Sequence, residues 1–216
     1  FVIIKHLNNK QQKRFKRRVC KFIRMKKFKA AGELKEVSFE MKVMIAATAI
    51  QITYGLPDLY FTHFQMIILY EKEYYSEITG DYHFGEVNAM GAIVLSWENF
   101  LFGYSNQTDG RNLAIHEMAH ALLLSNILDI EEYNFINKEE KYRFDELAYK
   151  EIQKIEDGES NFFREYGATN LQEFFAVTVE CFFEQPVQFK AYNHALYMQL
   201  VKILRIDILN YTGAAG

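Results

Sequence analysis

The stretch RNLAIHEMAHALLL (residues 111–124) places two histidines and a glutamate among residues that otherwise favour burial. His116 and His120 are four residues apart, so on a helix their rings project from one face, one turn apart. Two imidazole nitrogens in that arrangement can bind one zinc ion. Glu117 follows His116, and its carboxylate can reach a water molecule beside that ion. The stretch therefore fits the HExxH arrangement, with two metal ligands and a general base.

A pair of hydrogen-bonded core histidines would produce the same letters, so the surroundings decide between the two interpretations. A polar loop, NQTDG (residues 106–110), leads directly into the helix expected over residues 112–126. Alanine and leucine surround the histidines, as in the apolar shell that keeps a metal site dry. These surroundings favour a metal site, and a catalytic zinc usually takes a third protein ligand.

The third ligand cannot follow the extended metzincin pattern, which needs a glycine and a histidine where this chain has Leu123 and Asn126. A His or Glu from another helix is needed instead. Glu173 and Glu180 lie one heptad apart on one face of an apolar helix, where acids without a partner would be costly. A metal or a metal-bound histidine is such a partner. The alternative is that both carboxylates lie at the edge of the apolar stripe, in water.

The composition is that of a globular protein. Half of the 216 residues are hydrophobic, a quarter are charged and two are prolines, so we expect a single domain over residues 1–216 with a core rich in Phe and Tyr. The net charge of −3 indicates no particular partner. Cys20 and Cys181 are too few for a disulfide framework or a thiolate metal site, which favours a reducing, cytoplasmic location.

Charge is concentrated near the beginning of the chain. Between Lys5 and Lys29 there are twelve Lys or Arg residues and no Asp or Glu. Apolar residues recur there at helical spacing, which predicts a basic amphipathic helix within residues 1–30, packed on the domain. The residues are Phe15, Val19, Phe22 and Ile23. The alternative is a module that uses its basic face on a membrane surface or a nucleic acid; we expect no nucleic-acid partner.

No run of about 20 apolar residues is present, so the sequence predicts no membrane span. The chain begins FVII without a Met, so a membrane partner is expected only through an anchor upstream of Phe1.

Periodicity and turn residues give the remaining elements. Helices are expected over residues 38–54, 139–157, 170–184 and 189–209, and strands over residues 66–70 and 91–97. Thr169 and Gln172 fit a capping box at the start of the helix over residues 170–184. The sum is a helix-rich α+β fold with a small sheet.

Three segments, NLAIHEMAHALLL, YGATNLQEFFAVTVECFFEQP and GAIVLSWENF, resemble the zinc-peptidase family of Mlc titration factor A, a bacterial group related to the zincins. The resemblance runs from about Phe15 to Leu209 and implies a zincin-like fold with an active-site HExxH helix and C-terminal helices. It implies metal ligation by His116, His120 and Glu173 and a base at Glu117. It also implies that Tyr166 stabilises the transition state. Glu180 is implied to contact a residue that binds the metal, and not the metal itself.

Three further expectations concern the surroundings of the site. The strand over residues 91–97 should lie along the cleft, where its free edge could hold an extended peptide. Asn112, one turn before His116, either orients the site or starts the helix. The family commonly has an aspartate at the position of Leu123, so ligand orientation here should depend on Glu180 or on a backbone carbonyl.

The leading hypothesis is therefore a zinc-dependent peptidase of the gluzincin type that acts on peptide or protein substrates, with one zinc ion per chain. Aminopeptidase activity is implied by the resemblance alone. The alternative is a regulatory binding protein that keeps the scaffold and sequesters a transcription regulator or another protein partner. Intact HEMAH together with Glu173 and Tyr166 favours the enzyme, because binding alone needs no base beside a metal.

Overall fold

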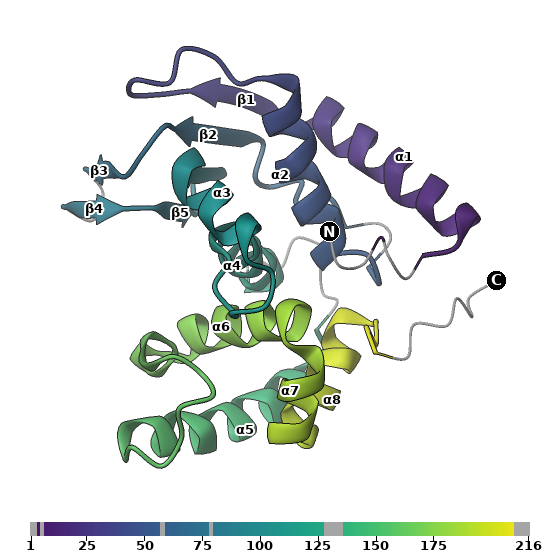
Figure 1. Ribbon diagram of the computed structural model, residues 1–216, viewed down its shortest axis with the longest axis vertical. Helices are drawn as coiled ribbons and strands as arrows, with labels where there is room; N and C mark the ends of the chain where they lie inside the picture. The colour runs from purple at the N-terminus through teal and green to yellow at the C-terminus, as the bar shows by residue number, and fades with distance from the viewer. Residues whose placement is uncertain (1–3, 5–6, 57–58, 78–79, 128–135, 210–216) are drawn as a thin grey trace.

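The chain forms a helix-rich α+β arrangement with a small mixed sheet, as the sequence predicts (Figure 1). The computed structural model describes residues 4, 7–56, 59–77, 80–127 and 136–209. The described strands are β1 (Lys27–Ala30), β2 (Met66–Tyr70), β3 (Tyr74–Ser76), β4 (Asp81–His83), β5 (Gly85–Asn88) and β6 (Ala92–Ser96). The described helices are α1 (Asn9–Met25), α2 (Phe39–Ile52), α3 (Trp97–Ser105), α4 (Leu113–Ile127), α5 (Lys138–Glu156), α6 (Leu171–Glu184), α7 (Pro186–Tyr192) and α8 (His194–Leu204), with a 3-10 helix, η2 (Glu165–Thr169).

The main sheet has the order β1-β2-β6-β5. Strands β1, β2 and β6 are parallel, and β5 runs antiparallel to β6 at the edge. Strands β3 and β4 form a separate antiparallel hairpin. The expectation that the strand over residues 91–97 has a free edge is wrong: β6 is paired with β2 on one side and with β5 on the other, and β5 is the edge strand on that side. The strand also ends at Ser96, because that side chain caps α3 by accepting a hydrogen bond from Asn99 N.

Helix α4 lies at the centre of the fold and packs against α2, α3, α6, β5 and β6. It is apolar on all sides, as expected of a helix surrounded by protein. Its fully buried residues include Met118, Ala119, Ala121 and Leu122. Helix α4, which carries the two histidines, thus lies at the junction between the sheet, with its helices, and the C-terminal helices α5 to α8 (Figure 1).

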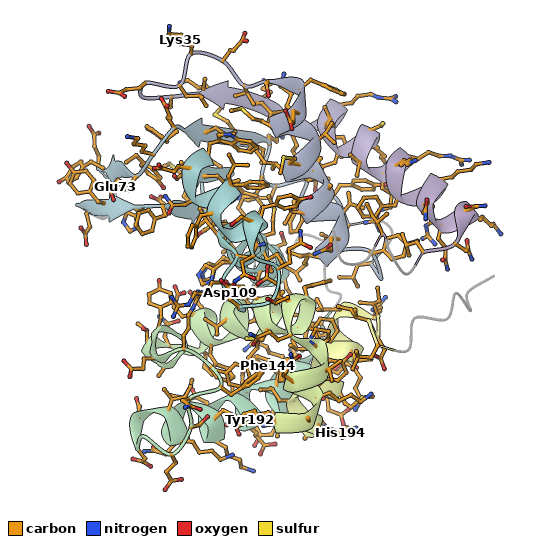
Figure 2. All side chains as sticks on the ribbon, in the orientation of Figure 1. Lys35, Glu73, Asp109, Phe144, Tyr192 and His194 are labelled. Atoms are coloured by element: carbon orange, nitrogen blue, oxygen red, sulfur yellow. The ribbon has the colours of Figure 1, made fainter. Side chains whose placement is uncertain are left out.

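The C-terminal helices enclose a cluster of aromatic side chains. Phe144 of α5 points toward α6, where its ring contacts Phe174 and Phe175 (Figure 2). The cap of α6 differs from the prediction: Asn170, not Thr169, accepts hydrogen bonds from Gln172 N and Glu173 N. The Thr169 hydroxyl instead donates to the Tyr166 carbonyl.

The single helix expected over residues 189–209 is in fact two helices. Asn193 leaves the helical region with φ −139° and ψ 85°, and its side chain caps α8 by accepting from Leu196 N. Because Asn side chains bond readily to nearby backbone, they interrupt helices and start new ones. Helix α8 ends at Arg205, whose φ is 52°, in the left-handed region that commonly closes helices.

Helix α1 packs its apolar face on α2, and Phe15, Val19 and Phe22 are buried. One arginine of this basic helix is buried as well: the Arg18 guanidinium donates to the backbone carbonyls of residues 53, 54, 56 and 59. Among the described helices, none is long and apolar enough to cross a membrane.

Lys26, directly after α1, carries its amine into apolar surroundings. The residue is 7% exposed, its Nζ lies 5.1 Å from the Phe22 ring centroid, and it donates a hydrogen bond to the Phe61 carbonyl. Burial lowers the pKa of Lys26 to about 7.

Replacing Lys26 by Met should therefore raise the free energy of unfolding near pH 7 and flatten its pH dependence. The folded lysine releases its proton near pH 7 and the unfolded one near 10.5. Between these values the unfolded state binds more protons, so wild-type stability rises with pH, by up to about 1.4 kcal/mol per pH unit. Urea unfolding between pH 6 and pH 10 measures this. Lys27→Met, which removes an exposed lysine, is the control, and an unchanged slope in Lys26→Met would contradict the prediction.

Candidate metal centre

The packing of α4 against α6 brings His116, His120 and Glu173 together (Figure 1). Nε2 of His116 and Nε2 of His120 lie 3.0 Å apart. Oε2 of Glu173 lies 3.0 Å from the first and 3.3 Å from the second. Glu173 reaches this point from the first turn of α6, whose start is fixed by the Asn170 cap. One ligand atom from each residue lies within 4.8 Å of the others, so the three could hold one metal ion.

Two observations indicate that the three residues fit a cation. Oε2 of Glu173 is buried and accepts no hydrogen bond from any described residue, and a buried carboxylate oxygen without a partner is unfavourable. His116 donates Nδ1–H to Glu180, so the lone pair of a neutral His116 ring lies on Nε2, toward Glu173. Acceptor atoms therefore face one another across about 3 Å, an arrangement that a cation between them stabilises.

Glu180 orients His116. Its Oε1 lies 2.7 Å from His116 Nδ1, and its Oε2 accepts a 2.6 Å hydrogen bond from the backbone N–H of Asn112. Glu180 is thus directed at a histidine ring and away from the three converging ligand atoms, as the resemblance implies. The carboxylate that contacts His116 therefore comes from Glu180 of α6. Leu123, at the position where the family commonly has an aspartate, is 5% exposed.

The sequence left open whether Asn112 orients the site or starts α4, and the structure shows contacts of both kinds. Its Oδ1 accepts a hydrogen bond from Ile115 N and so starts α4. Its backbone N–H donates to Glu180, and its Nδ2 donates to Glu184 Oε1 at 2.9 Å. Asn112 therefore ties the beginning of α4 to the end of α6.

Glu117 lies beneath the edge strand and is 5% exposed. A Cβ atom on Gly85 of β5 would stand 2.6 Å from Glu117 Cγ, so only glycine lets the strand pass this close. Burial raises the pKa of Glu117 to about 7, against the lowering effect of His116 and His120. A carboxylate with a pKa near neutrality is suited to accept a proton.

His116 and Glu173 shift each other's pKa. Burial opposes the charged form of His116, but the hydrogen bonds that the protonated ring makes to Glu173 and Glu180, and the charges of Glu180 and Glu117, raise its pKa to about 9. Burial likewise opposes the charged form of Glu173, but the two histidines beside it, when protonated, hold its pKa far below the ordinary value. The centre is therefore arranged around negative charge on Glu173 and Glu180.

Tyr166, from η2, lies beside the histidines, with its ring centroid 5.9 Å from that of His116. The side chain is 53% exposed and its hydroxyl group lies near Glu173. Burial, the charge of Glu173 and a hydrogen bond to it raise the pKa of Tyr166 to about 12. The hydroxyl group therefore keeps its proton at neutral pH and can act as a donor.

Sequence reasoning missed two charged residues of this network. Arg164 pairs with Glu180, and Glu184 accepts from Asn112. Burial raises the pKa of Glu184 to about 7. Arg164 precedes Tyr166 by two residues in FFREYGATNL, and a charge between aromatic residues is the one signal that could have indicated it. Its partner is sixteen residues away, with no periodic relation to it.

The candidate centre lies in a cleft with two arms. One arm, of about 280 Å³, is lined by Gln172, Glu173, His120, Leu123, Leu124, Glu86 and Val87. The other, of about 1010 Å³, is lined by Tyr82, Phe84, Phe102, Phe163, Arg111 and Arg164 among others. His83, Gly85, His116, Glu117 and Tyr166 line both arms. The two arms therefore meet beside His116 and Glu117.

Comparison with known proteins agrees with this geometry. Residues 1–205 match the family described as glucose-regulated metallo-peptidase M90. The chain belongs to this family. The match confirms the resemblance to the Mlc titration factor A family, and the description of the family implies a metal ion. The chain is also 24% identical over 215 residues to the uncharacterized protein slr2042 of Synechocystis sp., a similarity that covers 92% of this chain and 76% of that protein.

Proposed function

We propose that the protein is a zinc-dependent peptidase with a zincin-like fold and a single metal centre formed by His116, His120 and Glu173. The observation that carries the proposal is the convergence of these three ligand atoms beside a buried glutamate, in a cleft open at both arms. A catalytic zinc usually takes three protein ligands and leaves one position open.

The ligand spacing supports zinc. Bonds of about 2.0–2.1 Å in a tetrahedral site put neighbouring ligand atoms about 3.3–3.4 Å apart. The three separations here are 3.0, 3.0 and 3.3 Å, slightly short of that spacing. Two imidazole nitrogens with one carboxylate oxygen are also a ligand set that zinc commonly takes in hydrolases.

When bound, zinc supplies a Lewis acid that makes water more acidic and polarises the scissile carbonyl. Glu117 accepts the proton of the attacking water and delivers it to the leaving amine. Tyr166 donates its hydroxyl hydrogen bond to the carbonyl oxygen as negative charge develops there. Glu180 and Asn112 keep His116 in position during these steps.

The edge strand β5 supports a role in holding substrate. It lies against α4, and its residues Gly85, Glu86 and Val87 line the cleft. An extended peptide can add to such an edge through backbone hydrogen bonds. A peptide held in this way would carry its scissile bond past Glu117, which lies next to Gly85.

The proposal is tested by digesting a peptide library with zinc-loaded protein, with chelated protein and with chelated protein to which zinc has been returned. Hydrolysis should be lost and recovered. Paired peptides with free and acetylated amino termini test the aminopeptidase activity that the family resemblance implies. Stoichiometric zinc binding without hydrolysis of any peptide would overturn the peptidase and favour the regulatory binding protein.

Gly85→Ala should lower the rate of hydrolysis by about 10²-fold and leave zinc content unchanged. The added methyl group would stand 2.6 Å from Glu117 Cγ and displace the carboxylate, and a shift of about 1 Å in a catalytic group can cost that much. Gly167→Ala is the matched control, because its added methyl group would meet Val177 at an ordinary 3.4 Å. Unchanged turnover in Gly85→Ala would show that Glu117 tolerates displacement and argue against its role.

The larger arm of the cleft should favour peptide substrates that have a bulky apolar side chain next to the scissile bond. Its rim presents Tyr82, Phe84 and Phe102, which are 65%, 51% and 69% exposed. Exposed aromatic residues gathered on a concave surface mark a binding site. Phe102→Ala should lower kcat/KM by about tenfold for peptides with Phe or Leu at that position and leave Ala peptides nearly unchanged. Phe39→Ala, which removes an exposed phenylalanine outside the cleft lining, is the control. An equal effect on both peptide classes would contradict the assignment.

A further inference from the structure

Arg164 immediately precedes η2 and extends its side chain back to the metal centre. Its Nη2 donates to Glu180 Oε1 and lies 3.2 Å from His116 Nδ1. The centre of its guanidinium lies 5.7 Å from the Tyr166 ring centroid. One arginine thus contacts the carboxylate that orients His116 and also lies beside the ring of Tyr166.

The partner of Arg164 is a carboxylate with no access to water. Glu180 is 0% exposed, and a buried charge is unfavourable without a compensating charge and hydrogen bonds. Among the described residues, the ion pairs of Glu180 are with Arg164 and His116. His116 is neutral when it ligates a metal. Arg164 then supplies the positive charge that compensates Glu180.

The donors around Glu180 also fix the ring of His116. Oε1 accepts from both Arg164 and His116 Nδ1, and Oε2 accepts from Asn112 N. The close approach of Arg164 to the His116 ring follows, because both donors converge on the same oxygen. These three hydrogen bonds fix the orientation of the Glu180 carboxylate. His116, bonded to it through Nδ1, presents Nε2 toward His120 and Glu173.

We propose that Arg164 is a positioning residue of the metal centre, which acts on zinc through Glu180 and His116. The inference rests on the proposed zinc site but not on peptide hydrolysis. Loss of Arg164 removes the charge that compensates Glu180 and one of the two donors to its Oε1, so the carboxylate holds His116 less firmly in its ligating orientation. Removal of a partner that orients a metal ligand typically weakens metal binding by about 10–100-fold.

A double-mutant cycle on the full chain tests this, with the dissociation constant for zinc measured by chelator competition. Arg164→Gln should weaken zinc binding by about 10–100-fold, and Arg164→Lys, which keeps the charge and one donor, should recover most of it. Glu180→Gln should weaken binding to a similar extent. Arg164→Gln in the Glu180→Gln background should add less than about twofold, because the two residues act in series.

Arg111→Gln is the matched control: it removes an exposed arginine of the same cleft and should bind zinc like wild type. Wild-type affinity in Arg164→Gln, or an equal loss in both backgrounds, would overturn the role of Arg164. If Arg164→Gln does not fold, as circular dichroism will show, the double variant, which lacks the unpaired charge, decides: affinity well below that of Glu180→Gln overturns the proposal. Wild-type protein that binds no zinc would instead overturn the metal site itself.

Discussion

Glu117→Gln protein is expected to bind zinc like wild type and to hydrolyse peptides at least about 10²–10⁴-fold more slowly. An amide cannot accept the proton of the attacking water, and loss of a general base typically costs this much. Glutamine has the shape of glutamate, so it fits beneath Gly85, where Glu117 is 5% exposed. The effect should therefore fall on kcat, with the fold and the metal unchanged. Peptide turnover and elemental analysis of the same preparations measure both.

Glu151→Gln provides the control for that experiment. Glu151 is 1% exposed, lies outside the cleft lining and accepts hydrogen bonds from Tyr192 and Asn193. Its change to glutamine alters a buried carboxylate without touching the candidate centre, so turnover should persist. Retained turnover in Glu117→Gln would mean that another residue is the base. Loss of zinc in that variant would mean that the change disturbed the ligands.

Helices that carry strong local signals could be predicted from the sequence. The expected helix over residues 112–126 is α4, Leu113–Ile127, and that over residues 139–157 is α5, Lys138–Glu156. Helix α5 has apolar residues at helical spacing, and each helix has a residue at its start that accepts a backbone hydrogen bond, Asn112 for α4 and Asn137 for α5. The prediction that Thr169 caps α6 was wrong, because the neighbouring Asn170 has the backbone geometry of the cap and its side chain accepts from Gln172 N and Glu173 N.

The edge of the sheet could not be predicted in the same way. Strand β5 reads GEVN, which has one large apolar residue and no alternation. It forms because β6 offers it a pairing partner, and its position is set by the approach of Gly85 to Glu117. Helix α3 was missed because its cap, Ser96, ends an apolar run that reads as strand through Trp97. Both elements depend on tertiary contacts more than on local pattern.

The residues of the candidate site differ in the same way: some could be grouped from local spacing, and others meet only through tertiary contacts. His116, Glu117 and His120 lie on one helix, so their spacing was sufficient to group them. Glu173 and Glu180 were found because acids on an apolar face need partners; the family resemblance assigned them different roles, and the distances that separate those roles come from the packing of α6 on α4. Arg164 lies 48 residues from His116 and reaches it through a third residue. No spacing rule connects residues that meet only through the tertiary fold.

His120→Ala is expected to abolish zinc binding and its stabilising effect. The change removes one of three ligand atoms, and the remaining pair, His116 and Glu173, cannot complete the set that a catalytic zinc needs. Zinc at about 100 times its dissociation constant stabilises the folded state by about 2.7 kcal/mol. For a chain of this size that corresponds to a rise in Tm of roughly 5–10 °C. Wild type should show the rise and His120→Ala none. Undiminished zinc in His120→Ala would contradict the site.

Variants of Glu173 and Glu180 test which of the two carboxylates binds the metal. Oε2 of Glu173 lies 3.0 and 3.3 Å from the two histidine Nε2 atoms, whereas Glu180 contacts the far side of the His116 ring at Nδ1. Glu173→Ala should therefore lose zinc and the rise in Tm as completely as His120→Ala. Glu180→Ala should bind zinc more weakly but reach one ion per chain at saturating concentration. Because both glutamates lie on α6 and one heptad apart, they form a matched pair, and the opposite result would assign the metal to Glu180 and overturn the geometry proposed for the centre.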